Sequence, residues 1–142
     1  MAATPRAIEV CAAVIERDGR YLLGRRPAGS HLAGKWEFPG GKMHPGESRE
    51  ACILRELAEE LGLEASRPRL LVTIEHAYPE KTVRLHFLRC QVAAGSACLP
   101  AEHDGVGWFG LREAAALDLA PADRRFVEWA LERDGNGSAP AV

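Results

Sequence analysis

Residues 41–63 read GKMHPGESREACILRELAEELGL and combine a helix pattern with a dense group of glutamates. Pro45 and Gly46 break the chain before this helix. Ser48 is a preferred N-cap residue, and Gly62 is the residue type most often found at a left-handed C-cap. These signals predict a helix of about thirteen residues between Ser48 and Gly62.

This helix is expected to carry two different faces. The apolar stripe consists of Ala51, Leu54, Leu57, Ala58 and Leu61. Glu56, Glu59 and Glu60 are spaced i, i+3, i+4 and share a face roughly opposite that stripe. Like charges at this spacing destabilise a helix by a few tenths of a kcal/mol per pair unless a cation binds them. The pattern therefore favours a divalent-metal site, and its alternative is a solvated acidic face.

The spacing of nine residues between Gly41 and Leu63 distinguishes a metal site from a solvated acidic face. These positions are Gly41, Glu47, Arg55, Glu56, Leu57, Glu59, Glu60, Gly62 and Leu63. They resemble the complete Nudix box, G-x5-E-x7-R-E-U-x-E-E-x-G-U with U apolar, and a chance match has odds on the order of 10⁻⁷ to 10⁻⁶. Segments 36–42 (WEFPGGK) and 121–123 (PAD) resemble the MutT-like subgroup of the Nudix family and extend the likeness over nearly the whole chain.

The rest of the chain predicts an α/β (α+β) domain. The expected strands are 7–16, 21–23, 70–78, 82–92 and 106–109, with a final helix at 122–132. Asp18-Gly19 should close a hairpin, and alternation along 82–92 predicts a second hairpin with one buried face. The resemblance implies the Nudix fold, a mixed β-sheet sandwiched between helices. We expect a single domain over 1–134 and a disordered tail at 135–142.

Composition limits the partners and the compartment. The net charge of −2 argues against broad electrostatic binding to nucleic acid, and no apolar run reaches the ~20 residues of a membrane span. The four cysteines, Cys11, Cys52, Cys90 and Cys98, lack C-x-x-C spacing, and the first thirty residues lack a signal-peptide pattern. We therefore expect a cytoplasmic protein with reduced thiols and no membrane or nucleic-acid partner, either a monomer or a homodimer.

The resemblance implies Mg²⁺ as cofactor, with Mn²⁺ as a substitute, because hard cations prefer oxygen ligands. The implied metal ligands are the Gly40 carbonyl, Glu56, Glu59, Glu60 and Glu102, with Glu47 acting through water. Arg55 would orient neighbouring carboxylates by charge-assisted hydrogen bonds. The general base is Glu59 or a distant loop carboxylate such as Glu102, whose alternative is an isolated polar-loop residue.

Five residues are expected to contact the substrate. They are Arg26, His31, Phe38, Lys81 and Asp123. An ionised Asp123 would accept from an exocyclic amine such as cytosine N4, whereas a protonated Asp123 could bind an oxidised guanine. Its alternative role is to cap a helix that starts near Arg124. Arg26, His31 and Lys81 have solvated surface positions as their alternative.

The activity implied is hydrolysis of nucleoside triphosphates to monophosphates and pyrophosphate, as in nucleotide-pool sanitation that removes 8-oxo-dGTP. The first alternative is a pyrophosphohydrolase for CTP, dCTP or 5-methyl-dCTP. Other Nudix specificities, such as dinucleotide polyphosphates or nucleotide sugars, form a second alternative. A catalytically silent nucleotide-binding module is an alternative of another class, but such modules usually lose box carboxylates, and here all are present.

Overall fold

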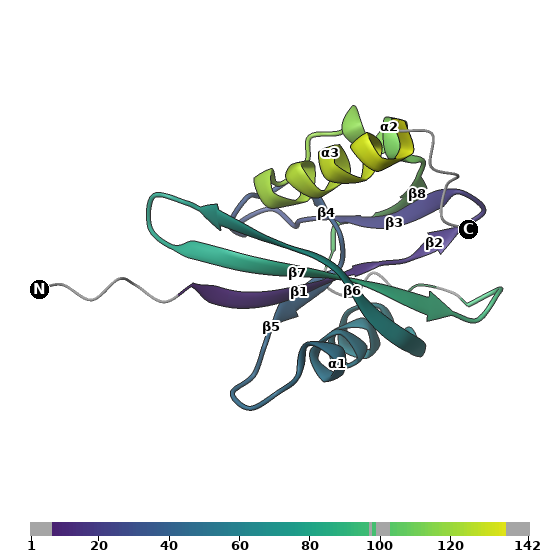
Figure 1. The fold of residues 1–142 in the computed structure, drawn as a ribbon, viewed down its shortest axis with the longest axis horizontal. Helices are drawn as coiled ribbons and strands as arrows, with labels where there is room; N and C mark the ends of the chain where they lie inside the picture. The colour runs from purple at the N-terminus through teal and green to yellow at the C-terminus, as the bar shows by residue number, and fades with distance from the viewer. Residues whose placement is uncertain (1–6, 97, 99–102, 136–142) are drawn as a thin grey trace, which may run out of the picture.

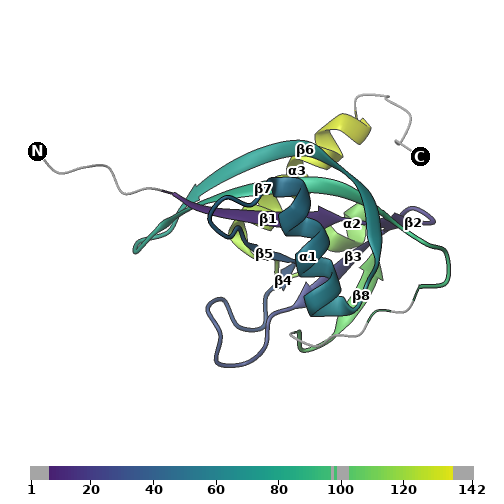
Figure 2. The same cartoon turned by 90° about the horizontal axis from the view of Figure 1, so that it is seen from below.

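The computed structural model describes residues 7–96, 98 and 103–135, and its strands lie between helices on two sides (Figure 1). The elements in chain order are β1 (Ile8–Val14), β2 (Glu16–Arg17), β3 (Arg20–Arg25), β4 (Trp36–Glu37), β5 (Gly40–Lys42), α1 (Arg49–Leu61), β6 (Ala65–Ala77), β7 (Thr82–Val92), β8 (Val106–Phe109), α2 (Leu111–Ala115) and α3 (Pro121–Gly135). Helix α1 covers one side of the strands, and α2 and α3 lie on the other (Figures 1 and 2). The predicted α+β class is confirmed.

The strands form two sheets rather than the single sheet expected. The first has the order β5-β1-β7-β6, in which β1 runs antiparallel to β5 and parallel to β7. In the second, β3 pairs with β2, β4 and β8. Strand β5 belongs to the first sheet and lies beside α1, whereas β4 belongs to the second sheet together with β8. The chain therefore passes from the second sheet to the first at residues 38–39.

The opening hairpin is present but shorter than expected. Asp18 and Gly19 form its turn with φ angles of 53° and 76°, and Glu16 is paired with Tyr21. The predicted strand 7–16 is nevertheless divided, because β1 ends at Val14 and belongs to the other sheet. Only β2 and β3 form the hairpin.

Two hydrophobic clusters hold the fold together, one on each side of the first sheet. Cys11 and Ala13 of β1 pack into the cluster beneath α1, whereas Ala12 and Val14 pack into the cluster beneath α3. The prediction of one buried face for 82–92 is wrong at its centre, where residues 85–88 are all buried. A strand covered by helices on both sides loses the simple alternation that sequence patterns rely on.

The C-terminal third contains one unexpected element and one longer than expected. Helix α2 follows β8 directly, and α3 covers the predicted 122–132 helix with extra residues at both ends. Gly135, placed in the tail by sequence, is the last residue of α3, and residues 136–142 of that predicted tail lie outside the described residues. The four cysteines are free. Within the described ranges, no helix is long and apolar enough to cross a membrane.

Candidate active site

Helix α1 is held at both ends by the residues that its sequence suggested. The Ser48 hydroxyl accepts a hydrogen bond from the Ala51 N–H at 3.0 Å. Gly62 adopts the left-handed conformation with φ 63°, and its N–H bonds to the Ala58 carbonyl at 3.1 Å. The predicted thirteen-residue helix, with its N-cap and C-cap, is confirmed.

The faces of α1 differ from the sequence prediction. The buried residues are Cys52, Ile53, Leu57, Glu60 and Leu61. Ala51 and Ala58, expected in the apolar stripe, are exposed. The helix is rotated because it packs against β1, β5 and β6 together, so its buried face is not centred on the small alanines. Glu60 therefore lies at the edge of the core with 5% of its surface exposed, not on the opposite face.

Arg55 is the centre of the carboxylate group. Its Nε and Nη2 donate to the two Glu47 carboxylate oxygens at 2.7 and 2.9 Å, and its Nη1 donates to Glu56 at 2.8 Å and to Glu59 at 3.2 Å. Nη2 also donates to the Lys42 carbonyl at 3.1 Å. The guanidinium thus joins three box carboxylates to strand β5 through charge-assisted bonds.

Glu47 is the carboxylate most firmly tied to Arg55. Hydrogen bonds from Arg55, with a further one from the His44 N–H, lower the pKa of Glu47 to about 2. The same pairing raises the pKa of the Arg55 guanidinium, so this ion pair persists across the physiological range. Both oxygens of Glu47 are occupied by Arg55, which assigns it a part in holding the arginine.

Strand β5 approaches α1 very closely at the glycine that opens the box. A Cβ atom on Gly41 would lie 2.4 Å from the Glu56 carboxyl carbon. Glycine at this position therefore leaves the space that the Glu56 carboxylate occupies. Gly40, the expected carbonyl ligand, precedes it in β5 and lines the same cleft.

A cleft with two compartments runs from α1 toward α3. The carboxylate compartment has a volume of about 400 Å³ and includes Glu56, Glu60 and His103 in its lining. The apolar compartment, of about 370 Å³, includes Leu32, Val83 and Leu85. Both compartments share Arg26, Glu37, Gly40, Gly41 and Lys42. The shared residues make the two compartments one continuous site.

The apolar compartment gathers all five residues that sequence assigned to substrate. Arg26, His31, Phe38, Lys81 and Asp123 line it. Arg26 donates to both Glu37 oxygens at 3.0 and 3.2 Å, and the His31 ring meets the Tyr78 ring edge-on at 5.4 Å. The Phe38 ring packs in the core against Phe87 and Phe126. The segments that meet here are far apart in sequence.

Asp123 is buried at the end of the apolar compartment, with 4% of its surface exposed. Its Oδ1 accepts a hydrogen bond from the Phe38 N–H at 2.9 Å. Burial, reinforced by the charge of Glu37, raises the pKa of Asp123 well above its ordinary value. The alternative of a cap for a helix near Arg124 is wrong, because α3 begins at Pro121 and Asp123 lies inside its first turn.

Glu37 and His103 are among the polar residues of the cleft to which the sequence assigned no role. Glu37 lies between Arg26 and His103, whose Nε2 is 3.1 Å from Glu37 Oε2. His103 Nδ1 is 3.7 Å from Glu60 Oε2. Glu37 lies inside the quoted 36–42 segment, so that segment was the available signal for it. For His103 the only signal was its position next to Glu102.

The oxygen donors of this site fit a hard divalent cation, since Glu56 and Glu60 face the same compartment and Gly41 leaves room beside them. In the part of the chain that the structure describes, no three acidic, imidazole or thiol side chains gather around one point that could hold a metal ion. Arg55 draws Glu56 and Glu59 toward itself instead. Glu102, the expected loop ligand, lies outside the described residues.

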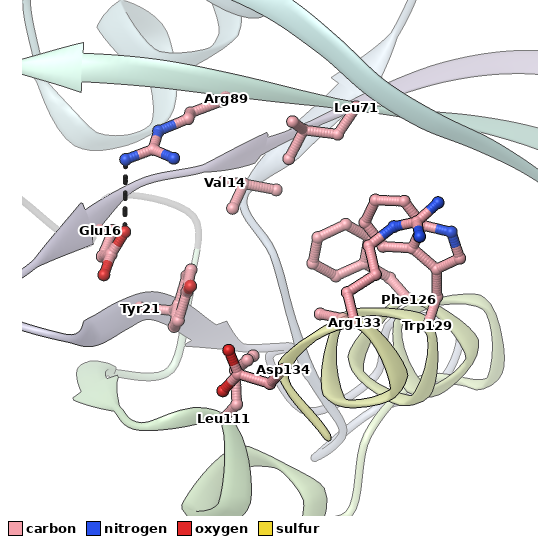
Figure 3. Close-up of a pocket in the computed structure, with 11 residues that line it drawn as sticks. Val14, Glu16, Tyr21, Leu71, Arg89, Leu111, Phe126, Trp129, Arg133 and Asp134 are labelled. Carbon is pink, nitrogen blue, oxygen red and sulfur yellow. Dashed lines mark hydrogen bonds and ion pairs between the residues drawn. The ribbon is translucent and has the colours of Figure 1, made fainter. Parts of the chain in front are cut away.

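A separate pocket of about 200 Å³ lies between α3 and residues of β1, β2, β3, β6 and β7. Figure 3 shows Arg89 paired with Glu16 on one side of it and Phe126 and Trp129 of α3 on the other. None of the residues assigned to the site from sequence lines this pocket. The candidate site residues that line a cavity therefore line the cleft and not this pocket.

The cleft places a carboxylate-rich helix beside an apolar compartment. Known proteins resemble this chain in sequence and in fold. The family model for the NUDIX domain matches residues 10–129. The CTP pyrophosphohydrolase of Escherichia coli (strain K12) is 42% identical over 124 residues, which cover 87% of this chain and 90% of that protein. The 8-oxo-dGTP diphosphatase of the same strain is 32% identical over 123 residues, covering 86% and 95%.

Solved structures agree with these sequence matches. The solution structure of the E. coli ORF135 protein has a TM-score of 0.80 at 38% identity, covering 95% of this chain and 96% of that one. The crystal structure of the MutT protein from Methanosarcina mazei Go1 also has a TM-score of 0.80, at 29% identity, covering 96% and 100%. The chain belongs to the Nudix hydrolase family.

Proposed function

We propose that this protein is a nucleoside triphosphate pyrophosphohydrolase that releases a nucleoside monophosphate and pyrophosphate. The observation that carries the proposal is the continuous cleft, with the box glutamates Glu56 and Glu60 at one end and Asp123 at the other. A nucleoside triphosphate is a polyanionic phosphate chain joined to a planar base, whose faces are apolar. The two compartments match its two halves in chemistry.

The phosphate half requires a cation, because the triphosphate and the box glutamates are both negatively charged. Mg²⁺ is the proposed cofactor, with Mn²⁺ as a substitute, held by Glu56, Glu59, Glu60, the Gly40 carbonyl and Glu102. The bound ion would supply charge neutralisation for the phosphate oxygens and a more acidic water. In the family, divalent metals serve this purpose.

The protein's own groups divide the remaining tasks. Hydrogen bonds from Arg55 orient the carboxylates of Glu56 and Glu59, and Glu47 in turn orients Arg55. Glu59 has 57% of its side chain exposed, which leaves it able to accept a proton from an attacking water. Arg26 lines both compartments, which supports a role for it between the base and the phosphates of a bound nucleotide. Its charge is partly offset by Glu37 until an anionic substrate enters.

The base half is proposed to be selected by Asp123. Burial favours the protonated form, which both donates and accepts a hydrogen bond, whereas the ionised form only accepts. A neutral carboxyl is compatible with 8-oxo-dGTP, the first proposed substrate, in support of nucleotide-pool sanitation in the cytoplasm. It is also compatible with the N3 and N4 edge of cytosine, so CTP, dCTP and 5-methyl-dCTP form the second proposal. The relatives named above include both kinds of enzyme.

The test is pyrophosphate release with Mg²⁺ from 8-oxo-dGTP, dGTP, dCTP, 5-methyl-dCTP, CTP and dATP at equal low concentrations. A large kcat/KM advantage for 8-oxo-dGTP supports sanitation, and an advantage for the cytosine nucleotides supports the second substrate class. Orthophosphate is measured without added pyrophosphatase, so that stepwise removal of single phosphates is detected. If no nucleotide in this panel released pyrophosphate with Mg²⁺ or Mn²⁺, the proposed function would be wrong.

A further inference from the structure

His103 is a buried imidazole placed between two carboxylates of the cleft. Only 3% of its side chain is exposed, although it belongs to the loop before β8. Nε2 is 3.1 Å from Glu37 Oε2. An ionised carboxylate can only accept, so Nε2 is the donor in this bond.

The other ring nitrogen faces Glu60. Nδ1 lies 3.7 Å from Glu60 Oε2, which is longer than a hydrogen bond. In the described part of the chain, Nδ1 is one of two buried side-chain nitrogen or oxygen atoms without a hydrogen-bond partner. A buried polar atom without a partner is unfavourable, and a small approach of Glu60 would satisfy it.

The position of the ring is set by packing and by the backbone. A Cβ atom on Gly24 would lie 2.6 Å from the His103 ring, so the imidazole fits against β3 only because residue 24 has no side chain. The loop is held to the same strand by the Asp104 N–H bond to the Arg25 carbonyl at 2.8 Å. The Arg25 N–H bond to the Gly105 carbonyl, at 3.0 Å, closes the pair. The His103 ring is therefore held in one position beside the Glu60 side chain.

We propose that His103 is a positioning residue that acts through Glu60. Both ring nitrogens carry a proton in this arrangement, since each faces a carboxylate that can only accept. Nε2–H donates to Glu37, and Nδ1–H donates to one Glu60 carboxylate oxygen and leaves the other directed at the divalent cation. The inference rests on the proposed function, of which metal binding by Glu60 is a part. Carboxylates that bind metals are commonly held by a further hydrogen bond, and removing such a partner costs about ten- to a hundredfold in metal affinity or activity.

The experiment measures Mn²⁺ binding to the substrate-free protein from the electron paramagnetic resonance signal of free Mn²⁺. His103→Ala should raise the Mn²⁺ dissociation constant by about ten- to a hundredfold. The matched control is His86→Ala, which removes another buried histidine bound to a carboxylate, Glu9 at 2.7 Å, outside the cleft. That control should keep wild-type Mn²⁺ affinity. Circular dichroism verifies that both variants are folded.

A second variant displaces the imidazole without removing it. Gly24→Ala introduces the Cβ that collides with the ring, and should weaken Mn²⁺ binding in the same direction as His103→Ala. This variant keeps the proposal testable if His103→Ala fails to fold. Wild-type Mn²⁺ affinity in a folded Gly24→Ala or His103→Ala protein would overturn the proposal.

A double variant tests the route through Glu60. If His103 acts through that carboxylate, His103→Ala should have no further effect on Mn²⁺ affinity in a Glu60→Gln background. An undiminished effect there would overturn the proposal by showing that His103 acts elsewhere. Absence of Mn²⁺ binding by the wild-type protein would instead contradict the metal site of the proposed function, and this inference with it.

Discussion

The side chain of Glu59 is more exposed to solvent than those of Glu56 and Glu60. Its side chain is 57% exposed, whereas the side chains of Glu56 and Glu60 are 12% and 7% exposed. Neutralising it therefore removes a charge without disturbing packing. Glu59→Gln should lower kcat by about 10²–10⁴-fold, the range for a lost general base, and leave the melting temperature nearly unchanged.

The measurement is pyrophosphate release together with a thermal melt. Glu64→Gln is the control, because Glu64 is an exposed glutamate just beyond the same helix. It should change neither quantity. Near-normal kcat in Glu59→Gln would transfer the role of general base to another carboxylate.

Asp123 allows a test of base selection that spares the fold. In Asp123→Asn the amide oxygen can still accept the hydrogen bond from the Phe38 N–H, so the local structure should persist. The variant should alter the kcat/KM ranking of bases more than the maximal turnover, as expected of a recognition group. An unchanged ranking across the same nucleotide panel would assign Asp123 a structural role only.

The raised pKa of Asp123 also predicts how stability depends on pH. The folded state binds this proton more tightly than the unfolded state, whose Asp titrates near the ordinary value of 3.8. The stabilisation linked to the proton is complete below that value and is lost as the pH rises through the folded pKa. Asn does not ionise, so the melting temperature of Asp123→Asn minus that of wild type should increase with pH above about 4. Parallel melting curves against pH would contradict this.

At the scale of the element, the N-cap of α1 can be separated from the chemistry that the helix carries. Ser48→Ala removes the acceptor of the Ala51 N–H, and should lower the free energy of unfolding by about 1 kcal/mol. Turnover by the folded protein should be unchanged. Urea unfolding measures the loss, and Ser66→Ala, on an exposed position of β6, is the control expected to stay within about 0.5 kcal/mol of wild type. Equal stabilities of the two variants would show that the cap contributes nothing.

The elements also show where sequence patterns succeed and where they fail. Both ends of α1 were predictable because Ser48 and Gly62 act on their own helix through local bonds. The buried face was not, because its rotation depends on β1, β5 and β6, which pack against it from other parts of the chain. The two-residue strand β4 was likewise not assigned as a strand, since its partner is β3 and its sequence is too short to carry a period.

At the scale of the whole molecule, we expect the two hydrophobic clusters to hold the fold without the metal. One cluster lies beneath α1 and the other beneath α3. Chelation with EDTA should therefore abolish pyrophosphate release while the far-ultraviolet circular dichroism spectrum stays native. Re-addition of Mg²⁺ should restore activity and raise the melting temperature, because binding to the folded state stabilises it. Loss of native dichroism in EDTA would show that the metal is structural.

The sequence by itself determined what depends on local or regular spacing: the α+β class, the thirteen-residue helix with its caps, the family, and the glutamates of the box. Only the tertiary structure decided which distant residues meet. It divided the strands between two sheets, buried Glu60 beside His103, and brought Asp123 of α3 to the Phe38 backbone. Such contacts join residues many positions apart, and no periodic pattern records them, because they follow from how the sheets and helices pack.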